Sequence, residues 1–515
     1  MTLPETLLDP QAYPHPARDL RMIETHISWV FLAGEHAYKV KKPLRLAFLD
    51  YSTRELREAA CREELRLNRR TAPELYIDVV PIGGSPPRVD GGGPILDWAV
   101  RMHRFPQQAL FAAMADDGLL HPWQVDSLAE AIASFHGKAD VSAADSGFGS
   151  PLAVEGDALR NFSEIAALSP PEGMASEALA VLRQWTVDAA AALRERFEAR
   201  RAGGFVRECH GDLHLGNVVL VAGGPRPFDC IEFDPALRWT DVMSDVAFLF
   251  MDFAARGLPR LGYRFLDRYL ERTGDFEGVR LLRFYAVYRA MVRAKVAYLR
   301  WAQAAPEKAE ETLDDATFHV ELAARLAHVE PPVMVLMHGP SASGKTGASQ
   351  RVLESLGALR VRSDIERWRL PAAAAAKPGE RIYAKSRIDA TYARLAAIAA
   401  TILDAGYPVV VDATFLSAAR RARFHGLAAT KGAALEIMSC RAPVDVLRAR
   451  IELRLRKGHD ASEADLSVLA EQMRGADALD GTEGQQATLL DTTSPGEWIG
   501  AVETFARRHG NALRP

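Results

Sequence analysis

Residues 339–346, GPSASGKT, constrain the fold of this chain more than any other segment. They match the pattern G-x-x-x-x-G-K-[S/T] and follow an apolar run, residues 333–337, which is typical of a buried strand. The following residues 348–356 favour a helix. A strand, a glycine loop and a helix in this order direct backbone N–H groups and the positive end of the helix dipole at one anion. The sequence therefore predicts a loop that holds a polyphosphate.

The side chains of this loop suit a nucleotide that carries Mg²⁺. The two glycines allow the tight turn, Lys345 supplies a positive charge for the β- and γ-phosphates, and Thr346 offers a hydroxyl to the cation. We predict that the nucleotide is bound by Gly339, Ser341, Ser343, Gly344, Lys345 and Thr346.

The last third of the chain alternates apolar runs with helical stretches, which indicates a parallel sheet wrapped by helices. With the glycine loop, this predicts an α/β P-loop NTPase domain. The apolar runs are residues 333–337, 358–361, 409–412 and 435–440.

Upstream, strand patterns come first and helix patterns follow, which predicts an α+β domain with two lobes. The strands are expected at residues 76–82 and 95–102, with a Gly- and Pro-rich turn between them, and the helices at 122–136, 177–200 and 260–304 with a break at Thr273-Gly274. The stiff segment Glu330-Pro331-Pro332 separates the two patterns. We therefore predict domains at 1–328 and 333–515, joined by a linker at 329–332.

The composition excludes several classes of protein. The 63 basic and 67 acidic residues give a net charge of −4, so no overall field favours nucleic acid or an anionic membrane. The N-terminus lacks the pattern of a signal peptide, and no stretch approaches the about 18 apolar residues of a membrane span. The four cysteines are scattered without C-x-x-C spacing, which favours a reducing compartment. We expect a cytoplasmic protein.

A second group of polar residues lies in the first domain. Asp212 and Asn217 have the spacing D-x-x-x-x-N, and an apolar run, a glycine turn and Asp229 follow. In phosphoryl transfer, one carboxylate accepts the proton of an attacking hydroxyl, while an amide oxygen and a second carboxylate hold Mg²⁺. The spacing alone also fits residues that merely fill a polar loop.

The segments HGDLHLGN (210–217), FDCIEF (228–233) and DVMSDVAF (241–248) resemble the Brenner-type catalytic segment of aminoglycoside and choline-type phosphotransferases, which share the protein-kinase fold. The resemblance implies that Asp212 is the catalytic base, that Asn217 and Asp229 bind Mg²⁺, and that Asp245 steadies the catalytic loop. Glu232 is an alternative metal ligand.

In that fold a lysine on an early strand pairs with a helix glutamate and holds the α- and β-phosphates. Lys39, on a strand-like segment, and Glu64, within a helical one, are the residues expected in these roles, with Lys41 and Glu63 as close alternatives. The sequence departs from the family in its glycine-rich flap, which is represented by Gly34 alone.

Three further segments of the second domain carry polar residues near predicted strand ends. These are the run RSDIER with Asp364 and Arg367, the run VVVDATF with Asp412, and a predicted helix with Arg450, Arg454 and Arg456. Strand ends of a parallel sheet lie near the ligand, and arginines suit a lid over phosphate, although a solvated helix face has the same pattern.

Together with the glycine loop, these segments resemble P-loop kinases of the polynucleotide 5′-kinase, zeta-toxin and gluconate-kinase kind. The resemblance implies that Asp364 activates the acceptor hydroxyl, that Arg367 clamps the acceptor or a phosphate, that Asp412 contacts the metal with its water or the acceptor, and that Arg454 closes the lid.

The whole chain resembles a bacterial family of bifunctional aminoglycoside phosphotransferase and ATP-binding proteins. The expectation is a tandem kinase with two sites for ATP and Mg²⁺ and no membrane partner. It would act on small hydroxylated molecules or, in the second domain, on a short nucleic-acid 5′ end. In the main alternative, the first domain is a pseudokinase sensor that regulates the second. A mechanical or switch NTPase is the third hypothesis.

Overall fold

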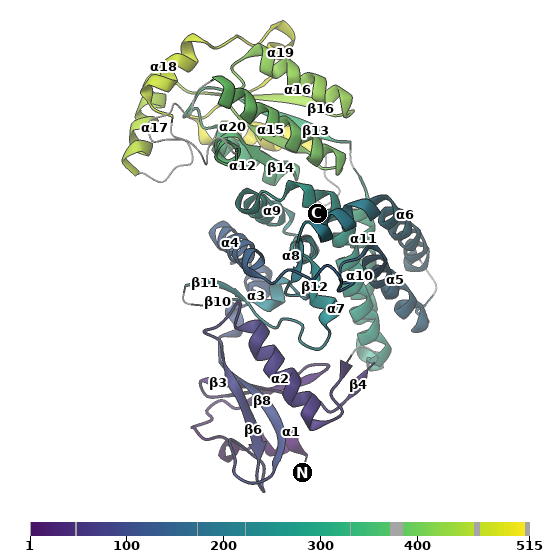
Figure 1. Ribbon diagram of the computed structural model, residues 1–515. Coiled ribbons are helices and arrows are strands. Elements are labelled where there is room, and N and C mark those ends of the chain that lie inside the picture. The colour runs from purple at the N-terminus through teal and green to yellow at the C-terminus, as the bar shows by residue number, and fades with distance from the viewer. Residues whose placement is uncertain are drawn as a thin grey trace. The chain divides into compact units, whose positions relative to one another are not determined.

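The computed structural model divides the chain into two compact units (Figure 1). Unit 1 comprises Met1–Asp157 and Ala192–Asp252, and unit 2 comprises Ala158–Ala191 and Phe253–Pro515. The predicted linker lies within unit 2, and Glu330 lies outside the described residues, so the predicted domain limits remain a prediction. The structure describes residues 2–46, 49–171, 174–221, 223–329, 331–370, 385–457 and 464–509.

Unit 1 begins with a six-stranded antiparallel sheet in the order β1-β2-β3-β8-β6-β7. Helix α2 packs against β8 and β6, and the buried side chains of the sheet include Phe31, Tyr38 and Val80. The elements are α1 (Leu3–Thr6), β1 (Arg21–Glu24), β2 (Ser28–Ala33), β3 (His36–Lys41), β4 (Arg45–Leu46), β5 (Leu49–Asp50), α2 (Arg54–Asn68), β6 (Tyr76–Gly83), β7 (Arg88–Val89) and β8 (Ile95–His103).

The rest of unit 1 is mainly helical and contains two short antiparallel strand pairs, β9 with β12 and β10 with β11. The loop with Asp212 lies between β9 and β10. Helices α5, α6 and α8 cross the division between the units. The elements are α3 (Phe111–Asp116), α4 (Pro122–Lys138), α5 (Pro151–Ala167), α6 (Met174–Ala202), β9 (Val206–Glu208), β10 (Val218–Val221), β11 (Gly224–Pro227), α7 (Pro235–Arg238), β12 (Trp239–Asp241) and α8 (Val242–Ala255).

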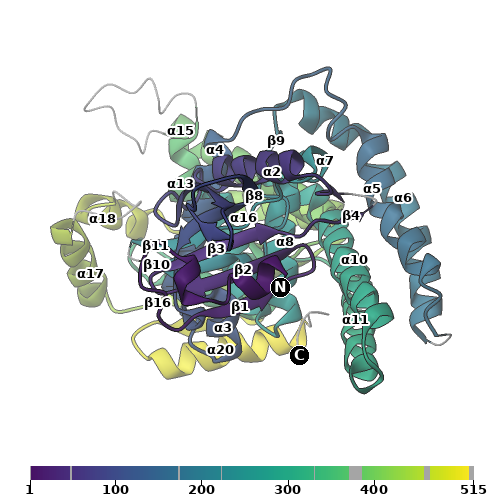
Figure 2. The same cartoon turned by 90° about the horizontal axis from the view of Figure 1, so that it is seen from below.

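Unit 2 contains three long helices, α9 (Pro259–Thr273), α10 (Val279–Gln303) and α11 (Pro306–Ala327). Helix α9 ends at Gly274, whose φ of 73° stops the helix where the sequence predicts a break. Helices α10 and α11 lie side by side (Figure 1, Figure 2). Helix α9 packs against the first helix and the edge strand of the domain that follows.

That domain has a parallel five-stranded sheet in the order β14-β15-β13-β16-β17. Its strands are β13 (Val333–His338), β14 (Leu359–Arg362), β15 (Val409–Asp412), β16 (Ala434–Arg441) and β17 (Thr488–Asp491). Its helices are α12 (Lys345–Leu356), α13 (Ser363–Trp368), α15 (Lys385–Asp404), α16 (Ala418–Thr430), α17 (Val444–Lys457), α18 (Leu466–Arg474), α19 (Gly481–Gln486) and α20 (Pro495–Arg508).

Both predicted fold classes are confirmed, a two-lobed kinase-like region followed by an α/β P-loop domain. The four predicted parallel strands are present, because each carries apolar residues that the sheet buries, although β14 and β16 also contain the charged residues Arg360 and Glu436. The sequence did not indicate β17, an edge strand in which only Leu490 is fully buried. Within the described residues, no helix has both the length and the apolar character needed to cross a membrane.

Candidate active sites

Strand β3 and helix α2 bring Lys39 and Glu64 together in unit 1. Lys39 Nζ lies 2.9 Å from Glu64 Oε1 and also forms an ion pair with Asp229. Glu64 is fully buried and accepts a second ion pair from Lys41. Although burial alone would raise it, the two lysines lower the pKa of Glu64 to about 2. The glutamate is therefore ionised and holds two lysines at the centre of the sheet.

The alternatives named from the sequence have other partners in the structure. Lys41 binds Glu232 as well as Glu64, and the Tyr51 hydroxyl also donates to Glu232. Glu63 instead pairs with Arg238 at 2.7 Å. Glu232 and Asp229 are each paired with a buried lysine, but the side chain of Glu232 is 3% exposed and that of Asp229 is 41% exposed. Asp229 is the more accessible carboxylate for a metal.

Residues 210–217 form a loop whose backbone is bound by Asp245, in the first turn of α8. The backbone N–H groups of His210 and Gly211 donate to the two oxygens of Asp245, at 2.7 and 3.0 Å. His210 Nε2 lies 2.9 Å from the Phe228 carbonyl oxygen. Asp245 is completely buried, so its carboxylate sets the path of the loop that presents Asp212.

Within this loop Asp212 and Asn217 touch directly. Asn217 Nδ2 donates to Asp212 Oδ2 at 3.1 Å and to the Asp212 carbonyl at 3.0 Å, which turns the amide oxygen of Asn217 away from Asp212. The β10–β11 hairpin returns the chain beside Asn217, where the Phe228 N–H donates to the Asn217 carbonyl at 2.9 Å. Asp229 follows directly and meets Lys39. One amide oxygen and exposed carboxylates are a donor set that suits Mg²⁺.

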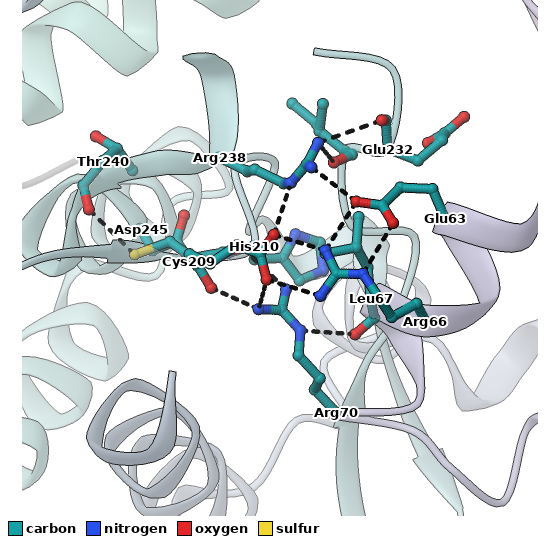
Figure 3. Close-up of polar contacts among 12 residues, drawn as sticks. Glu63, Arg66, Leu67, Arg70, Cys209, His210, Glu232, Arg238, Thr240 and Asp245 are labelled. Carbon is teal, nitrogen blue, oxygen red and sulfur yellow. Dashed lines mark hydrogen bonds and ion pairs between the residues drawn. The ribbon is translucent and has the colours of Figure 1, made fainter. Parts of the chain in front are cut away.

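An ion cluster ties α2 to the base of this loop. Arg66 in the last turn of α2, Arg70 just after that helix and Arg238 lie close together (Figure 3). All three reach Glu208, whose side chain is 4% exposed. Arg70 also donates to the Cys209 carbonyl at 3.2 Å. Because Glu64 lies on the same helix, the cluster places the lysine-binding carboxylate and the loop in one framework.

In unit 2, the conformation of the phosphate-binding loop requires its glycines. Gly339 has a φ of 138°, and a Cβ there would lie 2.5 Å from the Cys440 carbonyl oxygen. Gly344 has a φ of 86°, and its Cβ would lie 2.8 Å from Thr492. Lys345 folds over the loop and donates to the Pro340 carbonyl at 2.7 Å. Burial lowers the pKa of Lys345.

A cavity of about 500 Å³ opens in front of this loop. It brings together residues that the sequence predicts from four separate segments, whereas Gly339 and Ser343 of the loop do not line the cavity. The predicted residues that line it are Ser341, Gly344, Lys345, Thr346, Asp364, Arg367, Asp412 and Arg454.

The sheet explains why these side chains meet. Asp412 ends β15, and Asp364 lies in α13 directly after β14, so both occupy the carboxyl edge of the sheet beside the loop. Asp364 lies 3.2 Å from Arg367 one turn later. Asp412 is 6% exposed and accepts a hydrogen bond of 3.0 Å from Ser349 Oγ.

The three arginines of the predicted lid helix, α17, have different surroundings. Arg454 lines the cavity and donates to the Ala464 carbonyl. Arg450 braces the loop through the Ala342 carbonyl at 3.2 Å and the Thr492 carbonyl at 2.9 Å. The side chain of Arg456 is 75% exposed, as on a solvated helix face.

Sequence reasoning missed several residues of this cavity. Gln472 Oε1 accepts a hydrogen bond of 2.8 Å from the Ser341 N–H, and Arg420 lies over the Tyr392 ring at 4.7 Å. These side chains come from helices without a motif, so no local signal marks them. The functional roles assigned to the residues of both sites remain predictions.

Two family models match the chain. Residues 50–282 match the phosphotransferase enzyme family and residues 334–479 match an AAA domain. Similar full-length proteins are the uncharacterized protein Rv2004c of Mycobacterium tuberculosis (strain ATCC 25618 / H37Rv) and Mb2027c of Mycobacterium bovis (strain ATCC BAA-935 / AF2122/97). Each is 32% identical over 465 residues, which cover 88% of this chain and 91% of the relative. The chain belongs to their family. The tandem of a phosphotransferase domain and a P-loop kinase domain, predicted from the sequence, is confirmed.

Solved structures resemble each half separately. A choline kinase from Cryptosporidium parvum Iowa II is 11% identical and covers 60% of this chain and 88% of its own, with a TM-score of 0.39. A gluconokinase from Sinorhizobium meliloti 1021 is 21% identical and covers 35% of this chain and 94% of its own, with a TM-score of 0.26.

Proposed function

We propose that this chain is a tandem kinase in which each domain binds ATP with Mg²⁺ and transfers the γ-phosphoryl group to a hydroxyl. The observation that carries the proposal is the cavity of unit 2, in which Lys345, Thr346, Asp364 and Asp412 line one space. A phosphate-binding cation, two hard oxygen ligands and a candidate base are what phosphoryl transfer requires.

In the P-loop site, Asp364 takes the proton of the acceptor hydroxyl while that oxygen attacks the γ-phosphorus. The bond between the γ-phosphorus and its bridging oxygen breaks, and ADP leaves. Lys345 and Arg454 stabilise the charge on the transferring group. Thr346 and Asp412 would hold Mg²⁺, which neutralises charge on the phosphates when bound.

In the first domain, Asp212 has the same task as base. Asn217 and Asp229 would hold the cation, and Lys39, oriented by Glu64, binds the phosphates. The ion pairs of Lys39 with both Glu64 and Asp229 support this assignment, because they place the cation-binding and phosphate-binding groups side by side.

The acceptors we propose are small hydroxylated molecules or, for the P-loop domain, a short nucleic-acid 5′ end. A cavity of about 500 Å³ has the size of small-molecule sites. We also place the protein in the cytoplasm, which is supported by four buried cysteines without disulfides.

The second candidate function is a sensor role for the first domain. It is favoured by the turn between β2 and β3, which spans only Gly34 and Glu35 and therefore offers little backbone to cover a nucleotide. In that case the first domain binds a metabolite and regulates the P-loop kinase.

A screen with γ-labelled ATP tests both candidates. Metabolites and 5′-hydroxyl oligonucleotides are offered to the full chain and to its Lys345→Ala and Asp212→Ala variants. Two independent sites predict that each variant loses one activity and keeps the other. If Lys345→Ala abolishes every transfer and Asp212→Ala abolishes none, the sensor role replaces the tandem kinase.

A further inference from the structure

Two buried carboxylates of helix α9 face the P-loop domain. Asp267 and Glu271 lie four residues apart on α9, so they share one side of the helix, and they are 2% and 8% exposed. Helix α9 belongs to the segment that matches the phosphotransferase family, not to the segment that matches the AAA domain. Their partners are therefore found in a different sequence domain.

The first partner is Arg360 of β14, which is 3% exposed. Its Nη2 lies 2.7 Å from Asp267 Oδ2 and 3.3 Å from Glu271 Oε1. The same guanidinium donates to Ser349 Oγ at 3.0 Å, and Ser349 Oγ donates to Asp412 at 3.0 Å. One side chain thus separates Arg360 from the proposed metal ligand.

The second partner is Arg362, two residues further along β14. Arg362 Nη1 lies 3.1 Å from Glu271 Oε1, and its Nε lies 3.9 Å from Asp412 Oδ2. Arg362 also lines the cavity. Glu271 and Asp412 therefore compete for one guanidinium, and the stronger contact is with Glu271.

The charges of Arg362, Glu271 and Asp412 determine how this arrangement affects metal binding. Arginine keeps its proton, so each buried guanidinium needs a carboxylate. If Glu271 were neutral, Arg362 would keep its ion pair with Asp412 and would neutralise that carboxylate. A neutralised Asp412 is a poorer ligand for a cation.

Other contacts of α9 with this domain serve as a comparison. Arg264 pairs with Glu354 at 2.8 Å and Arg260 with Glu503 at 2.7 Å, both in more exposed surroundings. Neither glutamate lines the cavity. Glu354 also accepts a hydrogen bond from Gln350, which binds Arg360. The pair of Arg260 with Glu503 therefore serves as the comparison: it attaches the helix, whereas the pairs of Glu271 lead to Asp412.

We propose that Glu271 is a positioning residue of the P-loop kinase site: it holds Arg360 and Arg362 so that Asp412 stays available to Mg²⁺. Asp267 supports it through Arg360. The proposal rests on the kinase function proposed above. It makes α9 a part of the second active site, although that helix precedes the predicted linker.

The test is the Mg²⁺ requirement of the full chain. We expect Glu271→Gln to raise the Mg²⁺ concentration for half-maximal P-loop activity about tenfold, with a smaller change in KM for ATP, as for other groups that orient metal ligands. The double variant Glu271→Gln/Arg362→Gln is expected to recover most of the Mg²⁺ affinity, because the competing cation is gone. Arg260→Gln, on the same helix, removes the pair with Glu503; it is the matched control and should leave the requirement unchanged.

A measurement of metal binding tests the same role of Glu271 without requiring ATP turnover. Mn²⁺ bound in the presence of ADP is followed by electron paramagnetic resonance, and the P-loop fraction is the part that Thr346→Ala removes. An unchanged Mn²⁺ affinity in a folded Glu271→Gln variant overturns the proposal, as does a loss that the double variant fails to reverse. If Glu271→Gln does not fold cooperatively, Glu271→Asp replaces it and should give a smaller shift in the same direction.

Failure of the proposed kinase function can be distinguished from failure of the proposal for Glu271. If wild type shows no ATP turnover that depends on Lys345, the kinase function falls, while Mn²⁺ binding still reports on Glu271.

Discussion

At the scale of single residues, the P-loop contains glycines that shape its backbone and side chains that reach into the cavity. Gly339 and Gly344 determine the path of the backbone, since any Cβ at either glycine would collide. Lys345 and Thr346 line the cavity. Substitutions in the first group are therefore expected to disturb folding of the loop, and those in the second group its chemistry.

Lys345→Ala is the simplest test of chemistry. We expect kcat of the P-loop activity to fall at least about 100-fold, because a preorganised charge at the transferring phosphoryl group is lost. The free energy of unfolding should change little, since burial already disfavours the charged lysine. Steady-state kinetics and urea unfolding of the same preparation check this. A variant that keeps kcat would exclude Lys345 from the reaction.

His338, which precedes the loop, predicts a pH dependence of stability. Burial, with Arg421, Lys345 and Arg441 nearby, lowers its pKa to about 4. The unfolded chain takes up this proton near pH 6.5 and the folded chain only near 4, so the unfolded state binds more protons between these values.

The contribution of His338 is therefore lost as the pH falls from 6.5 towards 4, by about 1–2 kcal/mol after allowing for its partial exposure. Urea unfolding of wild type and His338→Asn at several pH values measures the difference. Equal pH slopes for the two proteins would contradict the assignment.

At the scale of elements, a cluster of ion pairs connects α2 to the loop that contains Asp212. Three arginines share the buried Glu208 at the end of β9. No motif predicts this cluster, because Arg66 and Arg70 each lie more than 130 residues before Glu208 in the sequence.

Glu208→Gln should destabilise the protein by about 1–3 kcal/mol, since Arg70 loses its carboxylate while Arg66 and Arg238 keep only Glu63. Arg62→Gln on the same helix is the control. It breaks an exposed pair with Glu58, so less than about 0.5 kcal/mol is expected. Chemical denaturation measures both. Similar losses in the two variants would mean that the cluster is not a buried ionic centre.

At the scale of the whole molecule, the sequence and the structure divide the chain differently. The sequence indicates a linker at 329–332, where the pattern changes, whereas the compact unit that contains the P-loop also contains α9, α10 and α11. Helix α9 packs against α12 and β14, and the buried Arg360 of β14 has its carboxylates on α9.

This predicts where the second unit can be cut. A fragment of residues 331–515 lacks Asp267 and Glu271 and exposes a strand with an unpaired Arg360, so we expect a broad or absent thermal transition. A fragment of residues 257–515 keeps both carboxylates and should unfold cooperatively at a higher temperature. Circular dichroism melts compare them, and equal melting behaviour would show that α9 is dispensable for folding.

The sequence by itself determined the P-loop and its flanking elements, the parallel strands and the candidate residues Asp212, Asn217, Asp364 and Asp412. These follow from local rules, because a glycine loop, an apolar run and a fixed spacing act within a few residues. Only the tertiary structure decided that Glu64, not Glu63, meets Lys39, and that β17 completes the sheet.

Only the tertiary structure, too, connected α9 to the second site. The choice between neighbouring glutamates depends on which side of a helix is buried, and the pairing of Arg360 with Asp267 depends on packing between segments 93 residues apart. Long-range pairing of this kind leaves no periodic pattern in the sequence, since each charged partner, considered alone, would be expected to lie on the surface.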